Sequence, residues 1–75
     1  FASQVCAVRR DLDLDPEKTN IYGGGISIGH PIGATGTVLT VKVMYELNRS
    51  SKKDAMISMC IGGGQGISMY FTKPE

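Results

Sequence analysis

One histidine, His30, and two cysteines, Cys6 and Cys60, are the side chains in this sequence best suited to nucleophilic or acid–base chemistry. His30 stands between Gly29 and Pro31, and Cys60 ends an apolar run just before a glycine cluster. A thiol at a strand end, beside unobstructed backbone N–H groups, suits an anion or oxyanion site. The alternatives are a packed or surface histidine and a small buried cysteine, the usual fate of a free thiol.

No third group at a recognisable spacing orients a Cys60–His30 pair, so the thiol-dependent hydrolase that such a pair suggests has little support. Cys6 falls near the apolar face of an expected helix, and we expect it in the core. The two cysteines and the single histidine form neither a disulfide framework nor a zinc site of familiar spacing. Two reduced cysteines fit a reducing compartment.

Ten glycines form two tight clusters, six between Gly23 and Gly36 and four between Gly62 and Gly66. This arrangement predicts two shaped loops rather than a flexible chain. The first cluster does not meet the dinucleotide pattern G-x-G-x-x-G in any register, and it lacks the Gly-Lys-Ser/Thr ending of a phosphate loop. Glycine here permits close backbone approach instead.

The composition is that of a folded domain, with 41% hydrophobic and 20% charged residues. A net charge of +1 gives no field to attract nucleic acid or an anionic membrane surface, so we expect neither as a partner. A chain of this length buries only about 60% of its unfolded surface and is marginally stable alone. We therefore expect these 75 residues to be a segment of a longer protein.

The elements that position these residues follow from hydrophobic spacing and turn signals. Phe1, Val5, Val8 and Leu12 share one helical face, and Asp15-Pro16 resembles the cap of one short turn. The remaining expectations are a strand over 21–28, a helix beginning at Pro31, and strands over 55–61 and 67–72 that pair antiparallel around a glycine turn. The stretch 37–47 fits a helix or a strand, and its length favours a helix.

Two runs of this sequence resemble the C-terminal signatures of thiolases. The first run, residues 20–36, is NIYGGGISIGHPIGATG, similar to Asn-x-x-Gly-Gly…Gly-His-Pro-x-Gly-x-x-Gly, and the second, residues 60–66, is CIGGGQG. Phe1-Ala2-Ser3-Gln4 also resembles the end of an Asn-Glu-Ala-Phe element of the family. The resemblance covers residues 1–75 and corresponds to part of the C-terminal domain, with the N-terminal half absent.

The family fold implies an α/β class, in which this segment ends the second half of an α-β-α-β-α layered structure. The expected element order is helix, strand, helix, strand, strand. The resemblance also favours the helix over residues 37–47, as the helix buried between two five-stranded sheets.

The resemblance further implies a role for three residues. His30 matches the histidine that activates the nucleophilic cysteine and stabilises the substrate thioester oxygen. Cys60 matches the cysteine that acts as general acid and base, and Gly62 matches the glycine whose backbone N–H contributes to an oxyanion hole. Enolate formation beside a thioester needs a base near the carbon and donors near the oxygen.

The same resemblance implies coenzyme A thioesters as substrates, no permanently bound cofactor and no metal, and a homo-oligomer, dimer or tetramer. It points to the cytoplasm, with the mitochondrial or peroxisomal matrix as alternatives. The nucleophilic cysteine and a water-orienting asparagine belong to parts of a family chain outside this segment, so we expect the segment to be inactive alone. Two alternatives are a ketoacyl-synthase-like condensing enzyme, which has histidine where Cys60 stands, and a non-catalytic packing or dimerisation module.

Overall fold

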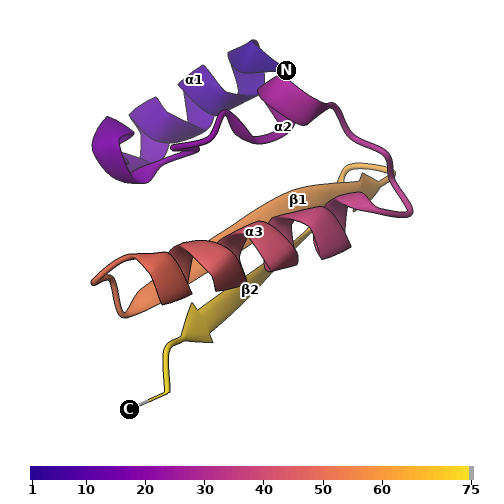
Figure 1. Ribbon diagram of the computed structural model, residues 1–75. Helices are drawn as coiled ribbons and strands as arrows, with labels where there is room; N and C mark the ends of the chain where they lie inside the picture. Colours follow the sequence, from indigo (N-terminus) through magenta and orange to yellow (C-terminus); the bar gives the residue numbers. More distant parts are fainter. Residues whose placement is uncertain (75) are drawn as a thin grey trace. The chain divides into compact units, whose positions relative to one another are not determined.

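The computed structural model describes residues 1–74, which form two compact units. The first unit spans residues 1–30 and contains α1 (Ala2–Leu12), the 3-10 turn η1 (Pro16–Lys18) and α2 (Gly24–Ile28). The second begins at residue 31 and contains α3 (Thr35–Arg49), β1 (Asp54–Gly62) and β2 (Gln65–Thr72) (Figure 1). Each unit is described by itself.

Local capping explains the elements of the first unit. Helix α1 ends where Asp13 adopts a left-handed conformation with φ +52°, and Arg9 and Arg10 complement the negative end of the helix dipole. The turn η1 begins as the Asp15-Pro16 signal predicts, because Asp15 Oδ1 accepts a hydrogen bond from the Glu17 N–H at 2.9 Å.

The strand expected over residues 21–28 is wrong, because residues 24–28 form α2. Two glycines with positive φ, Gly23 and Gly24, start the helix. It closes where the Gly29 N–H donates to the Gly25 carbonyl oxygen at 2.8 Å. An apolar pattern indicates a helix only over several turns, so five residues that include two glycines show no helical periodicity.

Helix α3 confirms the helical interpretation of residues 37–47, but it begins at Thr35 rather than at Pro31. The Pro31 carbonyl accepts hydrogen bonds from the Ala34 and Thr35 N–H groups, at 2.7 and 2.8 Å, and from Thr35 Oγ1 at 3.0 Å. Pro31 therefore opens a turn that leads into the helix.

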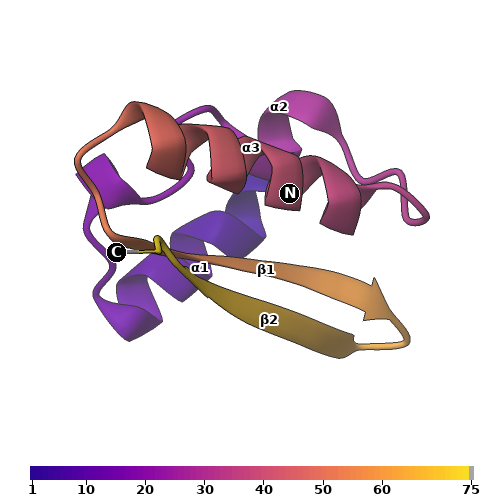
Figure 2. The ribbon, with the colours of Figure 1, turned by 60° about the horizontal axis from the view of Figure 1, so that its bottom comes forward.

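Strands β1 and β2 form the antiparallel hairpin that the sequence predicts, lying side by side in Figures 1 and 2. Helix α3 packs on β1, where Ala55, Ile57 and Met59 are half-buried. A Cβ on Gly36 would lie 3.4 Å from Met59 Cε, an ordinary contact distance, so Gly36 faces the Met59 side chain. The opposite face of β1 is exposed.

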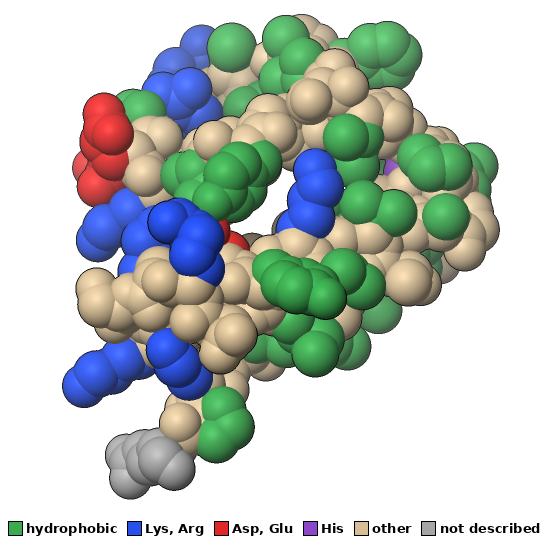
Figure 3. Space-filling model, viewed as in Figure 1, with side chains coloured by type: hydrophobic (Ala, Val, Ile, Leu, Met, Phe, Trp, Pro, Cys, Tyr) green, Lys and Arg blue, Asp and Glu red, His purple; other side chains and the backbone are tan. Residues whose placement is uncertain are grey.

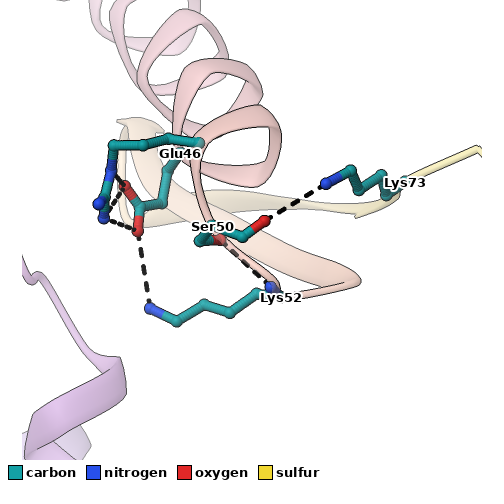
Figure 4. A network of polar contacts seen from close by, with 5 residues as sticks. Glu46, Ser50, Lys52 and Lys73 are labelled. Carbon is teal, nitrogen blue, oxygen red and sulfur yellow. Dashed lines mark hydrogen bonds and ion pairs between the residues drawn. The ribbon is translucent and has the colours of Figure 1, made fainter.

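A polar network joins the end of α3 to residues that flank the strands, Lys52 before β1 and Lys73 after β2 (Figure 4). Glu46, whose side chain is 12% exposed, accepts two hydrogen bonds from Arg49 Nη2 at 2.7 and 2.9 Å and one from Arg49 Nε at 3.0 Å. Lys52 Nζ lies 3.7 Å from the same carboxylate, and Lys73 Nζ donates to the Ser50 carbonyl oxygen at 3.3 Å. These contacts link the open end of the hairpin to the C-terminal end of α3.

Apolar side chains remain at the surface of both units (Figure 3). Within residues 1–74 the buried residues are Leu47 and Thr35, both on α3. One stripe of α3 is conspicuous, because Val41, Met44 and Tyr45 are 44%, 59% and 73% exposed. Such a stripe is typical of a helix that packs against another layer.

Candidate functional site

Cys60 and Gly62 come together at the turn end of the hairpin. The Gly62 N–H donates a hydrogen bond to Cys60 Sγ over 3.3 Å, and both residues are exposed. Cys60 is a free cysteine and is exposed in this structure, whereas the alternative placed it in the core. The pair brings a thiol, a group suited to proton transfer, next to a backbone N–H, the kind of donor that forms oxyanion sites.

The backbone around this pair is irregular. Cys60 pairs with Gly66 and Gly62 pairs with Gln65, so Ile61 is an extra residue without a partner, a β-bulge. Gly62 has φ +110°, a conformation that residues with a side chain rarely adopt. A Cβ at Gly62 would meet no atom within 4 Å, so glycine is required there by its backbone conformation rather than by lack of space.

His30 is the last residue of the first unit and is exposed. It follows α2 through Gly29, whose φ of +78° redirects the chain as the helix ends. Asn20 supports the other end of α2: its carbonyl accepts a hydrogen bond from the Gly23 N–H at 2.8 Å. Its amide atoms lie 2.8 to 2.9 Å from where a Cβ on Gly24 would stand. Asn20 and the glycines therefore shape the segment that presents His30.

Cys6 lies on α1 and is exposed, so its expected place in the core is wrong. The first unit contains no strand, and α1 has no buried residue. The apolar stripe that predicted burial also remains open, since Phe1 is 98% and Leu12 67% exposed.

Two structural features near the site, the bulge at Ile61 and the position of Asn20, are not predicted by the sequence pattern. The bulge at Ile61 depends on strand register, which a count of glycines and apolar residues does not determine. The placement of Asn20 over Gly24 depends on positive φ at Asn20 itself, +50°. Asparagine adopts this conformation more readily than most residues, so an asparagine before a glycine run is the one available hint.

Further polar contacts occupy the exposed face of the hairpin. Ser68 Oγ donates to Ser58 Oγ at 2.9 Å, and the Tyr70 hydroxyl donates to Asp54 Oδ2 at 2.7 Å. The hydrogen bond to Asp54 raises the pKa of Tyr70 above its ordinary 10.0, helped by partial desolvation and by the negative charge of Asp54.

Other kinds of site have less support in the described residues. An apolar hollow between α3 and the hairpin is lined by Gly36, Thr40 and Met59, among others, and includes none of the three proposed site residues. Across residues 1–74, no three His, Cys, Asp or Glu side chains gather in a way that would hold a metal ion. The helices of this part of the chain are all too short or too polar to cross a membrane.

The fold and the site define a class of protein domain. It is a mixed α/β domain in which an antiparallel hairpin follows the helices and carries a thiol beside a backbone N–H donor. The family model for the thiolase C-terminal domain matches residues 1–73. The chain therefore belongs to the thiolase family, and its fold class is the α/β class expected of that domain.

Curated relatives carry the same family names. The chain is 58% identical to the beta-ketothiolase BktB of Cupriavidus necator over 73 residues, which is 97% of this chain and 18% of the relative. It is 54% identical to the mitochondrial 3-ketoacyl-CoA thiolase of Rattus norvegicus over 69 residues, covering 92% of this chain and 17% of the relative. It is 45% identical to the acetyl-CoA acetyltransferase of Shinella zoogloeoides, covering 92% of this chain and 18% of the relative.

The chain thus spans less than a fifth of the length of these relatives. No solved structure shows a significant match to it.

Proposed function

We propose that these residues form the C-terminal catalytic part of a thiolase. The complete chain would transfer an acyl group to coenzyme A and form or cleave a carbon–carbon bond, converting two acetyl-CoA to acetoacetyl-CoA and coenzyme A, or thiolysing a 3-ketoacyl-CoA. The observation that supports this most is the Gly62 N–H directed at Cys60 Sγ at 3.3 Å, because it joins an acid–base group to an oxyanion donor.

Each of the three residues has one role in this proposal. Cys60 removes a proton from the methyl group of the acyl-CoA in synthesis and returns a proton to the departing carbanion in thiolysis. Gly62 donates its N–H to the oxyanion of the acyl-enzyme step. His30 activates the nucleophilic cysteine and donates to the thioester oxygen of the substrate. Removing a general acid or base costs about 10²–10⁴ in rate.

The nucleophile itself is supplied by the N-terminal half of the complete chain. Neither cysteine here takes that role: Cys60 is assigned as acid and base, and Cys6 lies on α1, where no catalytic group is proposed. The segment is therefore inactive alone.

Substrate, partners and compartment follow the family. The substrates are coenzyme A thioesters, and no permanently bound cofactor or metal takes part. The open stripe of α3 at Val41, Met44 and Tyr45 supports packing against the missing half. We propose a homo-oligomer, a dimer or tetramer, in the cytoplasm, with the mitochondrial or peroxisomal matrix as alternatives. The word 'mitochondrial' stands in the names of several relatives.

A second candidate is a non-catalytic packing or dimerisation module of a thiolase-like protein. The observation that favours it is the same exposed stripe of α3, together with a hairpin that has two open edges within residues 1–74.

Turnover measurements separate the two candidates. The complete protein is expected to cleave acetoacetyl-CoA in the presence of coenzyme A, and Cys60→Ala and His30→Ala are each expected to lower kcat at least about 100-fold. Cys6→Ala, the matched control, is expected to keep full activity. Undiminished turnover in both site variants would favour the packing module. Turnover by the 75-residue chain alone would refute the expected inactivity of the segment.

A further inference from the structure

The bulge at Ile61 has a consequence for the chemistry of Cys60. In a regular antiparallel strand, residues two apart point their side chains to the same face and their N–H groups to the same edge, away from each other's side chains. The extra residue breaks this pattern. At this irregularity the Gly62 N–H approaches the sulfur of Cys60 to 3.3 Å, and the φ of +110° at Gly62 turns the chain into the hairpin loop.

This N–H therefore has two potential acceptors. In the structure it donates to Cys60 Sγ. In the proposed function, the same N–H donates to the carbonyl oxygen of the acyl group on the nucleophilic cysteine. A backbone N–H carries a single hydrogen and makes one well-aligned hydrogen bond at a time.

We propose that the Gly62 N–H alternates between these acceptors, so that acylation of the enzyme withdraws a hydrogen bond from Cys60. This inference rests on the proposed function. The sulfur of Cys60 is thus released from its backbone donor when the acyl group is in place and a second acyl-CoA must be deprotonated.

A proton then passes from the second acyl-CoA to Cys60. A C–H bond of the methyl group of the second acyl-CoA breaks, and an S–H bond forms at Cys60. The electron pair of the broken bond passes into the enolate, whose carbon then bonds to the acyl carbon. The bond between that carbon and the sulfur of the nucleophilic cysteine breaks, and the cysteine leaves as a thiolate. The acyl oxygen keeps the Gly62 N–H during this step.

The test follows the Gly62 amide directly in the complete enzyme. The protein is assembled by peptide ligation with ¹⁵N at Gly62 alone, with Cys60 or with Cys60→Ala, and its amide resonance is recorded by NMR. Each form is recorded free and after acetylation by acetyl-CoA, with acetylation verified by the mass of the protein. A second preparation with ¹⁵N at Gly64, a turn glycine with φ +77°, is the matched control.

A shared donor predicts a specific pattern. Cys60→Ala is expected to shift the Gly62 amide proton in the free enzyme and to leave it unchanged in the acetyl-enzyme, where the acyl oxygen holds the N–H. The Gly64 resonance is expected to respond to neither change. A Cys60→Ala shift of equal size in both states, or a shift in neither, would overturn the alternation while leaving the proposed function standing. Absence of acetylation in the Cys60 protein would refute the proposed function, and this inference with it.

Discussion

Cys60 depends on its neighbours for its chemistry. Its sulfur accepts the Gly62 N–H at the bulge, where the regular register of the strand is interrupted. The residue types at these positions could be predicted as a candidate site from the sequence, since a cysteine followed by glycines allows an oxyanion arrangement. Their contact could not, because one inserted residue decides which way an N–H points.

The hydrogen bond of Tyr70 predicts how the stability of the protein depends on pH. Its hydroxyl donates to Asp54 Oδ2, which raises its pKa above 10.0. The phenol loses this donor when it ionises, so the hydrogen bond favours the neutral form of the folded state. The stability that it contributes is complete below pH 10.0 and is lost as the pH rises through the raised pKa of the folded protein.

A difference titration measures this effect. The phenolate absorbance of the complete protein, minus that of Tyr70→Phe, is expected to rise above pH 10.0. Asp54→Asn removes the charge and is expected to bring the transition down toward the ordinary value. A Tyr70 transition at the same pH with and without the Asp54 carboxylate would contradict the assigned cause.

Among the elements, α2 shows most clearly where sequence patterns fail. Residues 21–28 are mostly glycine and aliphatic, which favours a strand. The observed helix depends on positive φ at Gly23 and Gly24 and on the Asn20 side chain over Gly24. By contrast, α3 and the hairpin follow from long periodic segments and a glycine turn, and the sequence predicts both.

Two neighbouring glycines of α2 provide a matched pair of substitutions. Gly24 has φ +56° and lies against the Asn20 amide, whereas a Cβ on Gly25 would meet no atom within 4 Å. Gly24→Ala is therefore expected to destabilise the complete protein by about 1–3 kcal/mol, and to lower turnover because the segment leading to His30 moves. Gly25→Ala is expected to stabilise it by about 0.5–1 kcal/mol, because alanine loses less backbone entropy in a helix.

Denaturant midpoints and turnover of the complete protein check this pair. We expect the midpoints of the two variants to move in opposite directions from that of the parent. Equal midpoints would show that the left-handed backbone at Gly24 carries no strain for alanine.

At the scale of the molecule, the chain leaves many large apolar side chains exposed to solvent. Leu47 is the one large apolar side chain buried within residues 1–74. The expected burial of Cys6 failed for this reason, since the pattern on α1 indicates a face that packs but not what covers it. The relatives are more than five times as long as the matched region, which provides ample chain to cover these faces.

We propose that Cys60 acts as the acid and base in the complete protein and not as its nucleophile. The most direct measurement treats the complete Cys60→Ala protein with acetyl-CoA and follows two events, the gain in protein mass on acetylation and the formation of acetoacetyl-CoA. We predict that Cys60→Ala is still acetylated but forms acetoacetyl-CoA at least about 100-fold more slowly, while Cys6→Ala does both at the parent rate. Loss of acetylation together with condensation in Cys60→Ala, or parent-rate condensation, would contradict the account.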